Sequence, residues 1–241
     1  MSVQPAIRPR RFAPLCPEKA VEGDERPVLK GIVFDVDGTL CEPQTYMFAE
    51  MRSALNITKQ TDILDHIYSL PEPAQSRAQS QIRAIERTAM ATQTPQPGLA
   101  PLMSYLDSRA IPKAICTRNF DAPVAHLLTT FLPHSKFAPI VTREFRPPKP
   151  DPAGINHIAR SWGFAEAREM VMVGDSVDDM TAGWRAGAAT VLLVNEVNRH
   201  LVRHEHTDLV IGRLDELIGI LEEGFEGRGE VEVEDAVKVE Q

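Results

Sequence analysis

Short apolar runs alternate with longer segments of helical spacing along most of this chain. The short runs are rich in β-branched side chains, which is typical of buried strands, whereas the longer segments place apolar residues on one face of a helix. This alternation is characteristic of βαβ units and predicts an α/β fold with a mainly parallel, five-stranded sheet. The predicted strands are 31–35, 113–116, 139–142, 170–174 and 190–194, and the predicted helices are 97–108, 122–130, 152–162, 178–186 and 214–223.

The interval 42–96 interrupts this alternation. It contains no convincing strand, and proline-containing breaks at 70–73 and 95–98 divide it. Proline ends helices because it lacks the backbone N–H and clashes with the preceding turn. We therefore expect several short helices here, inserted between the first strand and the rest of the sheet. The segments 29–41 and 97–223 would then form the α/β core.

The two ends of the chain differ in charge from the middle. The formal net charge is −8, but residues 222–241 alone hold eight acidic and two basic residues. We expect residues 224–241 to form an acidic, disordered tail. Residues 1–28 contain several prolines and the basic Arg8, Arg10 and Arg11, with no acid before Glu18. We expect a disordered N-terminal arm, and a transit peptide is the alternative.

The composition argues against several classes of protein. No basic stripe with interleaved aromatic residues indicates a nucleic-acid partner, and no apolar run is long enough to cross a membrane. Cys16, Cys41 and Cys116 lack the spacing of a zinc site or a redox pair. An odd number of cysteines in a chain without an apolar signal segment indicates reduced thiols, so we expect a cytoplasmic protein, with a mitochondrial location as the alternative.

Four polar segments lie at or shortly after the ends of predicted strands. In an open α/β sheet, such segments would meet in the crevice at the carboxyl ends of the strands. Carboxylates, a hydroxyl and a lysine near one another offer a nucleophile, a proton donor and a grip on phosphate. The segments are Asp35-Val36-Asp37-Gly38-Thr39-Leu40, Thr117-Arg118-Asn119, Lys149-Pro150 and Gly174-Asp175-Ser176-Val177-Asp178-Asp179.

In residue types, order and strand context, this set resembles the haloacid dehalogenase-like (HAD) hydrolases over roughly residues 30–223. The resemblance implies a doubly wound, Rossmann-like core and a small, all-helical cap of the C1 type at 42–96. It also implies a phosphatase that forms an aspartyl-phosphate. Asp35 would be the nucleophile and Asp37 the acid and base. The presence of Asp37 favours phosphoryl transfer, because dehalogenases of the superfamily lack an acid at this second position.

The same resemblance implies a Mg²⁺ site and a phosphate cradle. Mg²⁺ would be bound by Asp35, the backbone carbonyl of Asp37 and Asp175, with Asp179 as a further ligand or supporting group. Phosphate would be bound by Thr117 and Lys149, helped by groups in Gly38, Arg118 and Asn119. Lysine is a common point-charge partner for phosphate, and loop amides bind anions.

The expected substrate is a small phosphorylated metabolite, since protein phosphatases with a similar first segment generally lack a large insertion between Asp35 and Thr117. A sugar-phosphate mutase shares all four segments and stays open as an alternative. So does a non-enzymatic regulatory or binding protein on a hydrolase scaffold. Lys59, the lysine of the insertion, raises the further alternative of phosphonate cleavage through a Schiff base. The sequence does not predict the oligomeric state.

Overall fold

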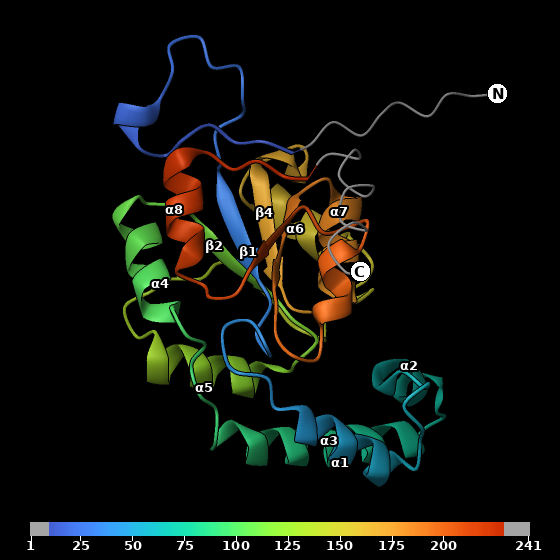
Figure 1. Cartoon of the computed structure of the whole chain (residues 1–241). Coiled ribbons are helices and arrows are strands. Elements are labelled where there is room, and N and C mark those ends of the chain that lie inside the picture. The colour runs from blue at the N-terminus through green and yellow to red at the C-terminus, as the bar shows by residue number, and fades with distance from the viewer. Residues whose placement is uncertain (1–9, 229–241) are drawn as a thin grey trace, which may run out of the picture.

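The computed structural model describes residues 10–228, which form an α/β fold around a six-stranded sheet (Figure 1). Every pair of neighbouring strands is parallel, and the strand order is β3-β2-β1-β4-β5-β6. The strands are β1 Gly31–Phe34, β2 Lys113–Cys116, β3 Ile140–Val141, β4 Met170–Gly174, β5 Ala189–Leu193 and β6 Leu209–Ile211. The predicted fold class is confirmed, but the predicted number of strands was one too low.

The strand that the sequence did not predict, β6, lies at one edge of the sheet. Its residues Leu209 and Val210 are only half-buried, whereas all residues of β1, β2, β4 and β5 are buried. A strand of three residues without a continuous buried face has little apolar signal, so its pattern resembles that of a loop.

Helices cover both faces of the sheet (Figure 1). One face packs against α4 Leu99–Ser108, α5 Asp121–Phe131 and α8 Glu216–Glu223, whose buried side chains join those of β1 in the larger hydrophobic cluster. The other face packs against α6 Ala153–Ser161 and α7 Val177–Ala186. The 3-10 helices are η1 Pro17–Lys19, η2 Ala167–Glu169 and η3 Arg199–Arg203. This two-sided packing explains why the central strands read as continuous apolar runs.

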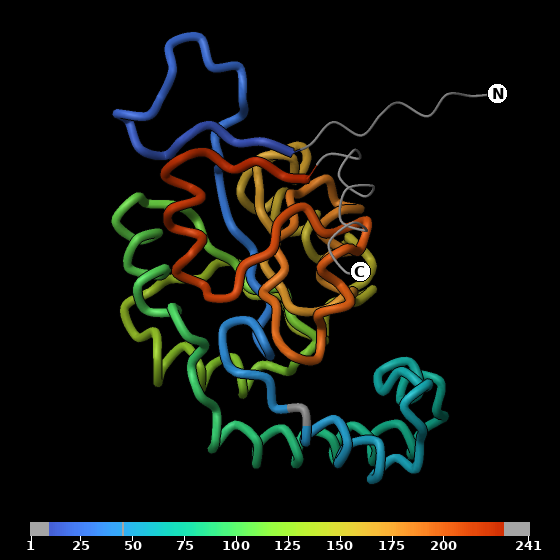
Figure 2. The backbone as a smooth tube through the Cα atoms, viewed as in Figure 1, coloured from blue at the N-terminus to red at the C-terminus, as the bar shows by residue number. Residues whose placement is uncertain are grey.

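The interval 42–96, which we call the helical insert, folds into α1 Thr45–Leu55, α2 Ile63–Ser69 and α3 Ala74–Met90. Its helices share a separate hydrophobic cluster that includes Met47, Met51, Ile67 and Ile82. The insert lies at one end of the sheet, opposite the ends of the described chain (Figures 1 and 2). It faces the end of the sheet that is formed by the carboxyl ends of the strands, including β1 and β4.

The inner parts of the two chain ends pack against the core. Phe12 and Phe225 are buried, their rings lie edge to face with centroids 5.6 Å apart, and the Phe12 N–H donates to the carbonyl of Phe225 at 2.9 Å. This differs from the arm expected over 1–28 and from the tail expected to begin at 224. The other parts of those two segments, residues 1–9 and 229–241, lie outside the described residues. Within residues 10–228, no helix combines the length and apolar character needed to cross a membrane.

Candidate active site

A cavity of about 460 Å³ lies between the end of the sheet and the helical insert. All four polar segments singled out in the sequence contribute to its lining, through residues that include Asp35, Asp37, Thr117, Lys149 and Asp175. The insert supplies the opposite wall, and Lys59 is an exposed residue of the insert that does not line the cavity. A cavity of this size is typical of sites for small molecules.

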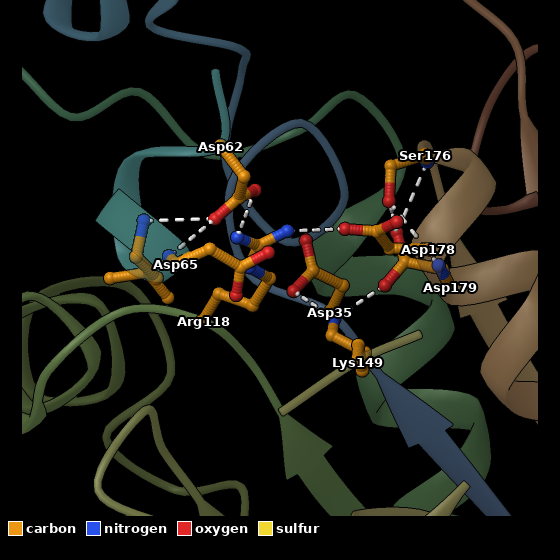
Figure 3. Close-up of polar contacts among 9 residues, drawn as sticks. Asp35, Asp62, Asp65, Arg118, Lys149, Ser176, Asp178 and Asp179 are labelled. Atoms are coloured by element: carbon orange, nitrogen blue, oxygen red, sulfur yellow. Dashed lines mark hydrogen bonds and ion pairs between the residues drawn. The ribbon is translucent and has the colours of Figure 1, made fainter. Parts of the chain in front are cut away.

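Asp35 directly follows β1 and is held from two sides. Its backbone N–H donates to the carbonyl of Val173 at 3.0 Å, which continues the pairing of β1 with β4. Its side chain, buried at the end of the strand, accepts a hydrogen bond from Lys149 Nζ at 2.7 Å (Figure 3). Burial raises the pKa of Asp35 to about 7 although Lys149 opposes this shift. The ion pair with Lys149 therefore favours the charged carboxylate.

Asp179 stabilises both Lys149 and the start of α7. Lys149 Nζ donates to its Oδ1, and its Oδ2 accepts from the Ser176 N–H at 3.0 Å and from the Ser176 hydroxyl at 2.6 Å. Ser176 in turn accepts from the backbone N–H of Asp179, which completes a capping box at the helix N-terminus. Both carboxylate oxygens of Asp179 are thus engaged, and the residue lies behind the cavity wall.

Three carboxylates form a cluster that could hold a metal ion. Oxygen atoms of Asp35, Asp175 and Asp179 all lie within 4.8 Å of one another. Burial, followed by the charges of Asp179 and Asp35, raises the pKa of Asp175 to about 8. A divalent cation would relieve this repulsion, and oxygen donors at this spacing suit a hard ion such as Mg²⁺. The donor set therefore fits the cation that the resemblance implies.

Asp37 lies two residues after Asp35, but its carboxylate has different hydrogen-bond partners. Its Oδ1 accepts from the Cys41 thiol, with an Oδ1–Sγ distance of 3.6 Å, while its Oδ2 is buried and has no hydrogen-bond partner within residues 10–228. Burial raises the pKa of this carboxyl group. Two acids so close in sequence thus have separate environments: one faces a lysine, and the other does not.

Gly38 brings the first and last polar segments into contact. Its φ is +81°, and a Cβ at this position would lie 2.1 Å from Asp175 Oδ2. Its carbonyl accepts from Gln96 Nε2 at 2.8 Å. Glycine is required here because the backbone conformation and the approach of Asp175 both exclude a side chain. Gly38 itself does not line the cavity.

Thr117 and Asn119 follow β2 and line the cavity from a buried loop. The Thr117 N–H donates to the carbonyl of Val141 at 2.9 Å, and its Oγ1 accepts from the Asn119 N–H at 3.2 Å. Both side chains are buried, as expected for groups in a phosphate cradle. The structure therefore brings them to the same cavity as Asp35 and Lys149.

Arg118 points between the core and the insert instead of toward Lys149 (Figure 3). Its Nη2 donates to Asp62 Oδ2 at 2.5 Å, and its Nη1 pairs with Asp178. Asp62 is the N-cap of α2, where its side chain also accepts from two backbone N–H groups. Arg118 therefore joins the insert to α7, which the sequence did not predict.

Sequence reasoning also missed further polar residues of the cavity. Asn195 donates to Asp175 Oδ2 at 3.3 Å, and Asn198 Nδ2 donates to the Asp175 carbonyl at 2.7 Å, so the loop after β5 fixes this carboxylate. Arg143 and Glu86 form a buried ion pair across the cavity. The position of Asn195 and Arg143 just after predicted strands was the signal that could have found them.

The geometry agrees with what comparisons with known proteins find. The family model described as haloacid dehalogenase-like hydrolase matches residues 29–187. An uncharacterized hydrolase of Saccharomyces cerevisiae is 48% identical over 198 residues, which cover 80% of this chain and 90% of the yeast protein. A phosphoglycolate phosphatase of Haemophilus influenzae is 28% identical over 127 residues, which cover 52% of this chain and 56% of that protein.

A solved structure shares the fold. CbbY from Rhodobacter sphaeroides, crystallised as a mutant with xylulose-(1,5)bisphosphate, has a TM-score of 0.65 with this chain at 20% sequence identity. The match covers 79% of this chain and 96% of CbbY. The similarity thus extends over nearly all of the other protein.

Proposed function

Because this chain belongs to the haloacid dehalogenase-like hydrolases and is an enzyme, we propose that it is a Mg²⁺-dependent phosphatase of small phosphorylated metabolites. The observation that carries the proposal is the pairing of Asp35 with Lys149 beside an Asp37 that has no such cation. The relative from Haemophilus influenzae, a phosphoglycolate phosphatase, and the sugar bisphosphate bound to CbbY support this class of substrate.

In the first step, Asp35 attacks phosphorus. A bond forms between its carboxylate oxygen and phosphorus as the bond from phosphorus to the ester oxygen breaks, and the departing oxygen takes a proton from Asp37. Lys149 holds Asp35 ionised and, with the Thr117 hydroxyl, stabilises the charge on the phosphoryl oxygens. The raised pKa of Asp37 suits a group that must arrive protonated.

In the second step, water releases the phosphate. Asp37, now a carboxylate, takes a proton from water while the water oxygen attacks the phosphorus of the aspartyl-phosphate. The bond between Asp35 and phosphorus breaks, so inorganic phosphate leaves and both aspartates return to their starting states. The acid of the first step is therefore the base of the second.

Asp35, Asp175 and the backbone carbonyl of Asp37 would hold the Mg²⁺ ion, with Asp179 as a further ligand or supporting group. The bound ion supplies positive charge that offsets the repulsion between Asp35 and the phosphate dianion. Lys149 adds a second positive charge beside Asp35, through a hydrogen bond of 2.7 Å. The helical insert would serve as the cap that excludes water from these groups.

A phosphate-release screen tests the proposal. Phosphorylated metabolites are incubated with and without Mg²⁺, with Asp35→Asn beside the wild type. We expect release that requires both the metal and Asp35. Transfer of the phosphoryl group to another position of the substrate, with no free phosphate, would instead identify a mutase. Release that persists in Asp35→Asn would contradict the covalent mechanism.

A further inference from the structure

One buried ion pair joins the helical insert to the core inside the cavity. Arg143 lies just after β3, and Glu86 lies on α3 of the insert. Arg143 Nη1 donates to Glu86 Oε1 at 2.7 Å, and each side chain is only 4% exposed. Both residues line the cavity that contains Asp35 and Asp37. The pair thus belongs to the active-site wall, although neither step described above uses it.

The guanidinium of Arg143 is fixed relative to the phosphate cradle. The Arg143 N–H donates to the carbonyl of Asn119 at 2.9 Å, and the guanidinium lies over the ring of Phe120, 5.1 Å from its centroid. Asn119 and Phe120 directly follow Thr117 and Arg118. Arg143 therefore keeps a constant orientation toward a group bound at Thr117.

Each partner has one buried atom left without a hydrogen bond. Arg143 Nη2 is a donor and Glu86 Oε2 is an acceptor, and neither has a partner in the part of the chain that the structure describes. Buried charged groups usually satisfy all their hydrogen-bonding atoms, so such atoms require an explanation. A donor and an acceptor on one ion pair in a cavity can be explained by a ligand.

The pair lines the same cavity as Asp37. Burial raises the pKa of Glu86 to about 7 although Arg143 opposes this shift, and the charge of Asp37 contributes to the rise. Asp37 is the proton donor to the ester oxygen in the proposed mechanism. Because Arg143 and Glu86 line the same cavity as Asp37, they can contact the alcohol part of a substrate bound there.

We propose that Arg143 and Glu86 bind a hydroxyl group on the alcohol part of the substrate, so that the enzyme prefers phosphomonoesters of polyols or sugars. This inference rests on the proposed phosphatase function. A hydroxyl can accept from Nη2 and donate to Oε2 at once. A carboxylate only accepts and would be repelled by Glu86, whose charge also cancels that of Arg143. An alkyl group would leave both atoms unpaired.

A neighbouring ion pair provides a matched control. Arg83 and Glu144 join the same helix to the same core loop, with Arg83 Nη2 and Glu144 Oε1 2.9 Å apart. Their side chains are 41% and 63% exposed, and neither residue lines the cavity. If the buried pair only held the insert on the core, breaking either pair would change the selectivity among substrates in a similar way. Of the two pairs, only the buried one lines the cavity and can contact a ligand there.

The test compares kcat/KM for three esters: glycerol 3-phosphate, ethyl phosphate and phosphoglycolate. We expect the wild type to prefer glycerol 3-phosphate over ethyl phosphate by about tenfold or more, as for sites that bind a substrate hydroxyl. Glu86→Gln removes the negative charge, leaves the charge of Arg143 uncompensated and puts an amide, which both donates and accepts, in place of two acceptor oxygens. It should weaken the preference for glycerol 3-phosphate and gain activity toward phosphoglycolate, whereas Arg83→Gln should keep the wild-type ratios.

Unchanged ratios in Glu86→Gln, or the same change in Arg83→Gln, would overturn the inference. Glu86→Asp provides a second variant that keeps the charge and withdraws the acceptor, and it should weaken the preference without any gain for phosphoglycolate. Calorimetric binding of the three esters to Asp35→Asn measures the same selectivity without turnover. A failure of the phosphatase proposal is thereby distinguished from a failure of hydroxyl recognition.

Discussion

The two walls of the active-site cavity use charge in different ways. On the core wall, Lys149 contacts both Asp35 and Asp179, and Asp179 also caps α7, so these groups form one connected and buried network. On the insert wall, charged groups meet the core singly: Asp62 contacts Arg118, and Glu86 contacts Arg143. A change in the core network should therefore affect every substrate, whereas a change on the insert side should affect substrates unequally.

Packing explains this difference. The core groups follow strands whose residues are fully buried and paired on both sides, so small displacements are resisted. The helical insert has its own hydrophobic cluster and folds around it. Its position over the sheet depends on a limited set of contacts that include these ion pairs. Under the proposed function, chemistry would thus rest on the rigid part of the molecule, and substrate selection on the part with fewer constraints.

The largest expected effect comes from Lys149→Met. Removing the lysine leaves Asp35, Asp175 and Asp179 without their buried cation, and breaking a buried pair on one side costs roughly 3–5 kcal/mol. We expect a lower free energy of unfolding in chelator and a fall in kcat of about 10²–10³-fold for every substrate. Urea unfolding and steady-state kinetics measure the two effects. Wild-type kcat in this variant would exclude Lys149 from the mechanism.

Gly38→Ala should have the next largest effect. The new Cβ would lie 2.1 Å from Asp175 Oδ2, and the residue would be held at a φ of +81°. Gly163→Ala is the control, because Gly163 has the same φ but a Cβ added there would meet no atom of the described residues within 4 Å. The control reports backbone strain alone, of roughly 1–3 kcal/mol. We expect only Gly38→Ala to lower phosphate release, by less than Lys149→Met does, and equal losses in both glycine variants would contradict the steric argument.

Arg118→Gln should have a smaller effect that depends on salt. Its side chain is 28% exposed and pairs with Asp62 of the insert and Asp178 of the core. We expect KM of the variant to rise a few-fold at low salt, as for the loss of a partly exposed ion pair. High salt screens this pair in the wild type, so the KM values of wild type and variant should converge there. Asp178→Asn breaks only the core side of this contact, so it should change KM less than Arg118→Gln does. An equal change would show that Arg118 does not act through the insert.

The remaining effect concerns pH and Glu86, and it is confined to one range of pH. The pKa of Glu86 is raised from 4.5 to about 7 in the folded protein. Between these pH values, Glu86 therefore keeps a proton in the folded state that it has lost in the unfolded state. The contribution of Glu86 to stability therefore falls as pH rises through this window, by up to roughly 3 kcal/mol. Glu86→Gln removes this contribution. Between pH 4.5 and pH 7.5, the melting temperature should decrease less for the variant than for the wild type. The same decrease in both proteins would contradict the role given to Glu86.

The sequence predicted the core of the site because its residues are tied to strand ends. Asp35, Thr117 and Asp175 each follow a buried apolar run, so the topology of a parallel sheet brings them together. The contact between Arg143 and Glu86 had no such signal: Arg143 follows a predicted strand, but Glu86 lies on a helix with other charged residues. Their contact depends on how the insert sits on the core, which no local pattern encodes.

Within the described residues 10–28, the N-terminal segment differs from its prediction for a related reason. Its prolines and arginines are typical of a disordered arm, and one aromatic residue among them, Phe12, gave no periodic signal. Phe12 is nevertheless buried because Phe225, from the far end of the described chain, packs against it. Contacts between distant segments decide such cases, and sequence periodicity does not report them.

The covalent mechanism is tested most directly by trapping the aspartyl-phosphate. In Asp37→Asn, the second step lacks its base, so the intermediate should accumulate after mixing with a substrate found by the phosphate-release screen and Mg²⁺. Rapid quenching followed by mass spectrometry should find one added phosphoryl group in the peptide that contains Asp35. Asp35→Asn combined with Asp37→Asn should show none. A phosphoryl group on another residue, or turnover in Asp37→Asn without any phosphorylated protein, would contradict the account.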